Sequence, residues 1–332
     1  MTRHDARRTT PRPPTSLLAV MAIVVGVASW FGGSHAATLL RQPRLTLWGY
    51  SVGARFSQPQ GVAIDPVDGA VYVSNTGQHR IEVFSASGRP LTQFVHRVTG
   101  DDGIVVDGSP RSLAFDRSGR LLVVDAAARY VDVLDVRARG VARLRVPEGH
   151  PTAVAVAKDG GIFVGTGGAA SKVFRFRADY TADGGWGDPG TAPGALREVV
   201  ALGVLDDSTI AVACPRTDLA IQVFTRDGRF VRGFGTHDVG DGNFSMPCGM
   251  VVTPDGRLWV LDEIRQVLQV FGGQGDFLTK SNGTGTALGE FVHPSSLAFD
   301  ERGLLAVADR EAGRVQVFAV TTPLVDVTHV QP

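Results

Sequence analysis

Three histidines have the side-chain chemistry to hold a metal ion: His79, His150 and His293. Three imidazoles that face one cavity can bind Zn²⁺ and leave one coordination position open, where the ion polarises a substrate or activates water. The three occur in different loop positions, so the alternative is that they are ordinary loop residues. The sequence therefore offers two hypotheses, a protein without a cofactor and a protein with Zn²⁺ or Ca²⁺.

Charged and polar side chains that follow predicted strands form a second group of candidates. Asp125, Asp262 and Asp309 occupy the same position of a repeat, where they could form an acidic ring for a cation. The alternative, which we expect, is that each carboxylate accepts backbone N–H bonds in its own loop or caps the neighbouring blade. The candidates for ligand contacts are Gln78, Arg129, Arg216, Asp262, Arg265, Asp309 and Arg310, the arginines because they suit carboxylates.

The two cysteines, Cys214 and Cys248, stand beside strands of adjacent predicted repeats. In an exported protein an even pair is a disulfide candidate. The alternative is that both are small buried apolar residues, as free cysteines often are. Other catalytic patterns are absent from the sequence, which has no Ser-His-Asp order, phosphate loop or HExxH stretch. The acidic stretch 100–108 lacks the spacing of a calcium loop and is predicted to be a solvated insertion.

The elements that must position these residues recur six times. Each copy has an apolar strand after a proline or small polar residue, then a turn, a second strand, and a third strand that ends on a large apolar residue. These terminal residues are 42 to 50 positions apart: Phe84, Leu134, Phe176, Phe224, Phe271 and Phe318. A fixed period of this size, with β-branched residues and glycine turns, predicts one small sheet per repeat.

A fourth strand follows the third in several copies, with Gly88, Gly140, Gly228 and Gly275 at or near the intervening turns, where glycine adopts positive φ at low cost. The predicted fold class is therefore all-β, a six-bladed β-propeller of four-stranded antiparallel blades. The first repeat begins late, and residues 45–48 read as an outer strand detached from its blade. We expect them to pair with residues 314–318 and close the ring; the competing strand is residues 323–327.

The stretches SNTGQHRIEVF, TRDGRFVRGFG and EFVHPSSLAFDERGLLAVADREAGRVQVF resemble NHL repeats, and the similarity covers about residues 44 to 320. The resemblance implies a propeller scaffold that serves many functions, including protein and RNA binding, sensing outside the membrane, and a metal-dependent amidating lyase whose metal is held by histidines. The third repeat departs most from the pattern, because it lacks the usual acidic residue after its second strand.

Strand alternation sorts the loops of such a ring into two ends. The loops that lead into the innermost strands and those between second and third strands share one end, which we call the mouth end. It collects all the candidates named above. The opposite end, which we call the far end, consists mostly of tight turns with Asp-Gly and Ser-Gly pairs. A site at the mouth of the central channel is therefore predicted.

The N-terminus predicts export. Four arginines precede an uncharged apolar run at residues 17–31 and a Ser-x-Ala site at 34–36, which together are typical of a signal peptide cleaved after Ala36. An uncleaved membrane anchor is the alternative, although the run is shorter than the about 20 residues of a bilayer span. The predicted organisation is residues 1–36 signal peptide or anchor, 37–43 linker, 44–320 propeller and 321–332 tail.

Lys plus Arg and Asp plus Glu both number 33, so the composition gives no sign of a nucleic-acid partner. We therefore expect a periplasmic, extracellular or outward-facing anchored protein, monomeric, that binds or senses a protein, peptide or glycan ligand through the mouth end. The alternative is an enzyme, a metal-dependent lyase or hydrolase that resembles the amidating lyase and uses the histidines.

Overall fold

The computed structural model describes residues 40, 42–168, 171–281 and 283–320. Several expected segments lie outside the described residues: the signal peptide or anchor, most of the linker, the tail, and the alternative closing strand at 323–327. In the part that is described, no helix is both long and apolar enough to cross a membrane.

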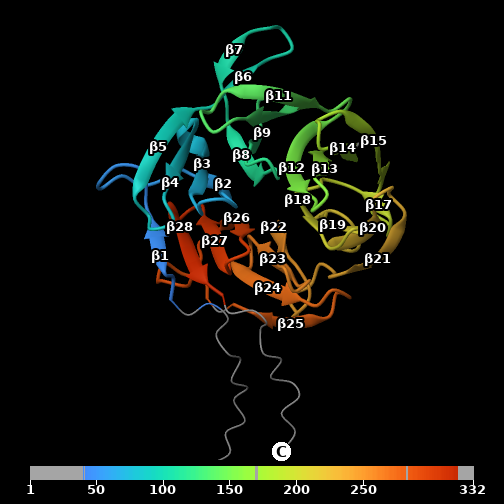
Figure 1. The fold of residues 1–332 in the computed structure, drawn as a ribbon. Coiled ribbons are helices and arrows are strands. Elements are labelled where there is room, and N and C mark those ends of the chain that lie inside the picture. The colour runs from blue at the N-terminus through green and yellow to red at the C-terminus, as the bar shows by residue number, and fades with distance from the viewer. Residues whose placement is uncertain (1–39, 41, 169–170, 282, 321–332) are drawn as a thin grey trace, which may run out of the picture. The chain divides into compact units, whose positions relative to one another are not determined.

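Six four-stranded antiparallel sheets confirm the predicted propeller. Figure 1 shows them around a centre, with the first strand of each blade nearest to it. Blade 1 contains β2 (Pro59–Ile64), β3 (Val71–Asn75), β4 (Arg80–Phe84) and β5 (Pro90–Val95). Blade 2 contains β8 (Pro110–Phe115), β9 (Leu121–Asp125), β10 (Tyr130–Leu134) and β11 (Gly140–Arg145), and blade 3 contains β12 (His150–Val156), β13 (Ile162–Gly167), β14 (Val173–Phe176) and β15 (Ala182–Trp186).

The second half of the ring repeats this arrangement. Blade 4 contains β18 (Ala201–Val204), β19 (Thr209–Ala213), β20 (Ile221–Thr225) and β21 (Phe230–Phe234). Blade 5 contains β22 (Pro247–Val252), β23 (Leu258–Asp262), β24 (Val267–Phe271) and β25 (Phe277–Lys280). Blade 6 contains β26 (Pro294–Phe299), β27 (Leu304–Asp309), β28 (Arg314–Ala319) and, from the start of the chain, β1 (Leu45–Leu47).

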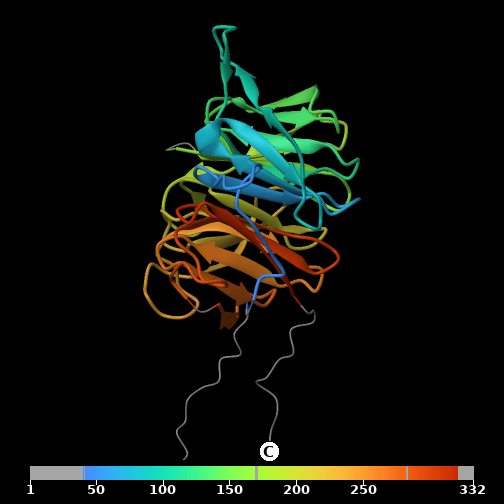
Figure 2. The same ribbon diagram turned by 90° about the vertical axis from the view of Figure 1, so that its left-hand side faces the viewer.

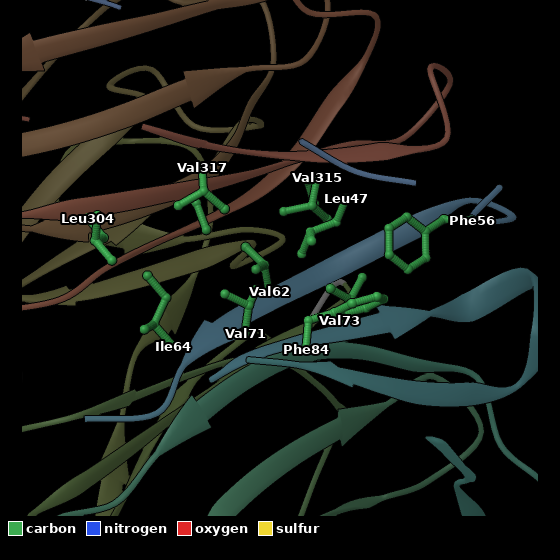
Figure 3. Packing of buried hydrophobic residues seen from close by; sticks show 12 residues of the cluster. Leu47, Phe56, Val62, Ile64, Val71, Val73, Phe84, Leu304, Val315 and Val317 are labelled. Atoms are coloured by element: carbon green, nitrogen blue, oxygen red, sulfur yellow. The ribbon is translucent and has the colours of Figure 1, made fainter. Parts of the chain in front are cut away.

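The ring closes as the sequence predicts, because β1 pairs antiparallel with β28 and places Leu47 opposite Val315. Leu47 is only 3% exposed and belongs to the apolar cluster between blades 6 and 1, which Figure 3 shows. Phe56 and Phe84 meet edge to face in the same cluster, with ring centroids 5.8 Å apart. Burial of a large aliphatic side chain contributes about 1.5–3 kcal/mol, so the closing strand is held by packing as well as by hydrogen bonds.

One turn differs from its prediction. Gly88, Gly228 and Gly275 have positive φ as expected, but in blade 2 the residue with positive φ is Ala138, at 58°, and Gly140 begins β11. Blade 2 therefore keeps a positive φ at the same turn position, although Ala138 occupies it and the glycine comes two residues later.

The predicted insertion at 100–108 is largely exposed, but it also pairs with itself. β6 (Arg97–Thr99) and β7 (Val105–Asp107) form a hairpin that projects beyond the blades (Figures 1 and 2). The remaining elements are a short parallel pair, β16 (Asp188–Pro189) and β17 (Ala195–Leu196), and the 3-10 turn η1 (Thr76–Gln78).

A buried glutamine in the third strand of blades 4, 5 and 6 fixes the loop that leads into each blade. Gln269 accepts a bond from the N–H of Gly242 at 3.0 Å and donates to the carbonyl of Asn243 at 2.8 Å. Gln222 and Gln316 make the same pair of bonds with the corresponding loops. Because these loops end at the innermost strands, the glutamines position the backbone of the mouth end.

Candidate functional site

The six innermost strands surround a cavity of about 1120 Å³ that reaches from the mouth end to the far end of the ring. Side chains two residues apart on a strand point to the same side, so alternate positions of each strand line the cavity. We number these positions from the residues that align at the start of the six repeats: Pro59, Pro110, Pro151, Val199, Pro247 and Pro294. The second position contributes Gln60, Arg111, Thr152, Val200, Cys248 and Ser295 at the mouth end. The fourth contributes an apolar ring of Val62, Leu113, Val154, Leu202, Met250 and Leu297.

Small polar side chains at the second position join neighbouring blades. Thr152 donates to the carbonyl of Val199 in blade 4 at 2.5 Å. Cys248 donates to Pro294 in blade 6 at 3.1 Å, and Ser295 donates to Pro59 in blade 1 at 2.9 Å. We call these three bonds the interblade latches. They satisfy backbone carbonyls at the mouth end and so belong to the scaffold of the site.

Arg111 breaks this pattern in blade 2. It is the only Arg, Lys, Asp or Glu within the six innermost strands, all of which are described. Its side chain is exposed in the cavity, and no hydrogen bond or ion pair joins it to any described residue. An unpaired guanidinium with five N–H donors attracts carboxylates and phosphates.

A charged cluster lies at the same end between blades 5 and 6. Arg310 donates through Nη2 to Oε1 of Glu263 at 2.7 Å, and Nδ1 of His293 is 3.8 Å from the same oxygen. Glu263 and Arg310 line the cavity. The cluster therefore combines an ion pair with the imidazole of His293, whose buried Nδ1 atom has no hydrogen-bond partner among the described residues.

Three non-glycine residues just before the innermost strands have a strained backbone conformation. Gln58, Glu198 and His293 have φ values of 51°, 60° and 53°, in the left-handed region that favours glycine. All three occupy the residue that directly precedes the first strand position. A non-glycine residue in this region costs about 1–3 kcal/mol, and such strain often accompanies functional sites.

The three histidines are not brought together. Among the residues that the structure describes, no group of three His, Cys, Asp or Glu side chains is placed to hold a metal ion. Nδ1 of His79 is 2.6 Å from the carbonyl of Gly108. His79 also has a φ of 57° at the turn position that Gln266 and Gly313 fill in blades 5 and 6, which gives it a structural role. His150 is exposed at the start of β12.

The recurring aspartates accept bonds from backbone N–H groups of the loop that leads into the same blade and, for Asp125 and Asp262, also from their own loop. Asp125 accepts the N–H groups of Ser109 and Ala127, and Asp262 accepts those of Ser245, Met246 and Arg265. Asp309 accepts the N–H of Val292 and pairs with buried Arg314 at 2.8 Å. Because Asp262 and Asp309 are 0% exposed, neither carboxylate is placed to touch a ligand.

The other candidate ligand contacts are engaged within the protein. Arg129 pairs with Asp101 at 3.2 Å, and Arg216 pairs with Glu198. Arg265 donates to the carbonyls of Asn243 at 2.5 Å and Gly240 at 3.1 Å. The amide oxygen of Gln78 accepts bonds from Asn75 and Arg80. Only Arg310, among the seven candidates, lines the cavity.

The disulfide hypothesis is not supported, because both cysteines are free thiols. Cys214 packs into the cluster between blades 3 and 4, whereas Cys248 packs against the cluster between blades 5 and 6. The two side chains therefore serve different blade interfaces. Burial raises the pKa of the Cys214 thiol to about 12 and that of Cys248 well above its usual value, so both are protonated and poor nucleophiles.

Arg111 is not among the candidates predicted from the sequence, because those candidates lie in loops and Arg111 lies within a strand. The signal was present: one charged residue at a position that Gln60, Thr152, Cys248 and Ser295 fill in other repeats. The cavity as a whole combines the unpaired cation of Arg111, polar side chains at the mouth end and the apolar ring at the fourth strand positions. This arrangement suits the binding of a ligand with an anionic group and an apolar body.

Comparison with known families and structures agrees with this architecture. The NHL-repeat family model matches residues 56–84 and 291–318, in blades 1 and 6. A search of curated protein sequences found no significant match. Solved structures that resemble the chain include a gluconolactonase from Xanthomonas campestris, with a TM-score of 0.60 and 17% identity over 87% of this chain and 93% of that chain.

A second similar structure is virginiamycin B lyase from Staphylococcus aureus, with a TM-score of 0.59 and 13% identity over 83% of this chain and 99% of that chain. A third is a streptogramin B lyase, with a TM-score of 0.58 and 14% identity over 82% of this chain and 96% of that chain. At these identities the likeness shows a shared fold. The chain therefore carries NHL repeats in a six-bladed propeller, a fold that enzymes also use.

Proposed function

We propose that this NHL-repeat propeller is a binding module for a ligand that carries an anionic group and an apolar body, held in the central channel from the mouth end. The observation that carries the proposal is Arg111, an exposed and unpaired guanidinium on the wall of a cavity of about 1120 Å³. The terminal carboxylate of a peptide and an acidic sugar both present such a group. The proposal is therefore compatible with the expected peptide, protein or glycan ligands.

The expected position of the ligand follows from the charges at the mouth. Glu198 and Glu263, the acidic residues that line the cavity there, are neutralised by Arg216 and Arg310. Arg111 thus supplies uncompensated positive charge, and exposed His150 stands nearby on the next blade. An anion bound at Arg111 places its apolar part against the ring formed by the fourth strand positions.

The test is titration of the protein with small carboxylates, followed by NMR or calorimetry. Arg111→Ala should weaken binding by about tenfold or more, because a charge-assisted hydrogen bond contributes about 1.5–3 kcal/mol. Arg137→Ala is the matched control, since Arg137 is an exposed arginine in the turn between β10 and β11 whose side chain makes no hydrogen bond or ion pair with a described residue. Equal affinities of the native protein and Arg111→Ala would contradict the proposal.

A second candidate is an enzyme, a hydrolase or lyase at the same mouth. The observation that favours it is the cluster of Glu263, His293 and Arg310, which combines a carboxylate, an imidazole and a guanidinium. No three-residue ligand set supports a metal-dependent form in the described part of the chain. Metal content of the purified protein, with His293→Ala beside it, separates the cases: one ion per chain that is lost in the variant favours the enzyme.

We also propose that the propeller acts outside the cytoplasm as a monomeric sensor or ligand carrier, on the strength of the N-terminal sequence. Four arginines, the apolar run at 17–31 and the site after Ala36 support export. The mass of the mature protein distinguishes cleavage after Ala36 from an uncleaved anchor. Recovery of the protein only from the cytoplasmic fraction would contradict export.

A further inference from the structure

The far end of the channel also carries unpaired cations. Arg117 and Lys158 stand in the turns that follow the innermost strands of blades 2 and 3, and both line the cavity. Both side chains are exposed, and neither makes a hydrogen bond or ion pair with a described residue. Two acidic residues line the cavity at this end, Asp116 on blade 2 and Glu301 on blade 6. Asp116 is only 5% exposed, and its carboxylate accepts bonds from the N–H groups of Ser118 and Arg120 and from the hydroxyl of Tyr180. Glu301 lies across the ring from blade 3.

These cations lie on the same side of the ring as Arg111. Blade 2 carries Arg111 at the mouth and Arg117 at the far end, and neighbouring blade 3 carries His150 and Lys158 at the corresponding ends. In Figure 1, β8 and β12 lie next to each other at the centre. One wall of the channel thus carries a cation without a partner among the described residues at each end, Arg111 at the mouth end and Arg117 with Lys158 at the far end.

The stretch between the two positive ends is apolar. Leu113 and Val154 stand between them on β8 and β12 and line the cavity. At about 3.3 Å per residue, the strand rises about 13 Å from Arg111 to Phe115, and Arg117 follows two residues later. Flexible side chains of Arg and Lys can shorten or lengthen the distance between the charged groups by several ångströms.

We propose that the channel binds a linear ligand with an anionic group at each end and an apolar middle, such as an α,ω-dicarboxylate. This inference rests on the proposed function, since one anionic group is the one held by Arg111. The second group binds to Arg117 and Lys158. The apolar middle lies along Leu113 and Val154, where it displaces water from apolar surface.

The charges support this ligand over a monoanion. Two like charges at one end of a channel repel each other unless an anion lies between them, and low-dielectric walls strengthen both effects. A monoanion at Arg111 leaves Arg117 and Lys158 uncompensated. A dianion of matching length neutralises both ends at once, and its two contacts reinforce each other because the second is intramolecular.

The experiment compares linear dicarboxylates with monocarboxylates of the same chain length, across a series of lengths, by calorimetry on the protein. We expect one length at which the dicarboxylate binds about tenfold or more tightly than the matched monocarboxylate. In the double variant Arg117→Ala with Lys158→Ala, the dicarboxylate should fall to the affinity of the monocarboxylate, which itself stays unchanged. Arg137→Ala is the control for loss of an exposed cation, and thermal unfolding of each variant checks the fold.

The outcomes separate the inference from the proposed function. The inference is overturned if the dicarboxylate binds no more tightly than its monocarboxylate, or if its higher affinity survives in the double variant. The proposed function still stands in these cases, provided that the binding of monocarboxylates depends on Arg111. Binding of neither series, or binding that is indifferent to Arg111→Ala, overturns the proposed function and the inference with it.

Discussion

His96 is a buried side chain that joins the projecting hairpin to blade 2. Its Nδ1 atom lies 2.7 Å from Asp125 and its Nε2 atom lies 3.2 Å from Asp132, and the side chain is 3% exposed. Burial alone would lower the pKa of His96, but hydrogen bonds with Asp125 and Asp132 outweigh it and raise the pKa to about 9. The imidazole is therefore protonated at neutral pH and bridges two carboxylates.

This bridge makes stability depend on pH. The pKa of His96 is higher in the folded state than its ordinary value of 6.5, so its contribution is fully present below about pH 6.5 and is lost as pH rises through about 9. The contribution is about 3 kcal/mol as an order of magnitude. Urea unfolding of the native protein between pH 6 and 10 should show this loss, and His96→Gln should lack it. His150→Gln, which removes an exposed histidine, is the control; a pH profile unchanged in His96→Gln would contradict the assignment.

The interblade latches give a second prediction at the residue scale. Thr152→Val keeps the shape of the side chain and removes the bond to Val199, leaving the carbonyl without that donor. We expect a loss of about 1 kcal/mol in the free energy of unfolding. Thr92→Val, on the exposed outer strand β5, should change it by less than about 0.5 kcal/mol. Equal losses in the two variants would mean that the latch has no net effect.

At the scale of elements, the closing strand β1 tests how the ring is held. Leu47 is 3% exposed and packs in the cluster that contains Val315 and Val317. Leu47→Ala should lower the free energy of unfolding by about 2–5 kcal/mol, because it leaves a cavity between blades 6 and 1. Thr46→Ala on the same strand should cost much less. Urea unfolding measures both, and a small effect of Leu47→Ala would show that β1 is dispensable for closure.

The blades and their closure could be predicted because each repeats the same local rules. Most repeats have a proline, an apolar strand, a glycine turn and a terminal aromatic residue at corresponding positions. In addition, the pair Trp48-Gly49 matches the end of outer strands such as Phe234-Gly235. The pairing of β1 with β28 followed from that match. The β6–β7 hairpin was not predicted, because its two three-residue strands are too short for an alternating pattern to stand out.

The site was predicted less completely than the fold, for a physical reason. The sequence shows which side chains are charged, but their partners depend on which loops meet in space. Arg216 and Arg265 looked available as anchors, yet Glu198 and the carbonyls of Asn243 and Gly240 engage them. Arg111 was overlooked because its strand reads as structural, although its charge departs from the repeat.

At the scale of the whole molecule, the residues that hold the fold together and the residues proposed to bind the ligand occupy different positions in the propeller. Third-strand glutamines and loop aspartates are buried and hold the loops of the mouth end, while the latches hold the innermost strands together. Among the described residues, the cationic channel side chains without a hydrogen bond or ion pair lie on blades 2 and 3. The proposed ligand therefore lies along that wall, with its anionic group at the mouth.

The most direct test of this claim is NMR of the arginine side chains during titration with a small monocarboxylate. We predict that the guanidinium signals of Arg111, assigned with Arg111→Ala, shift in a saturable way while those of Arg137 do not. Signals of Arg111 that stay fixed at saturating carboxylate, or that shift no more than those of Arg137, would contradict it.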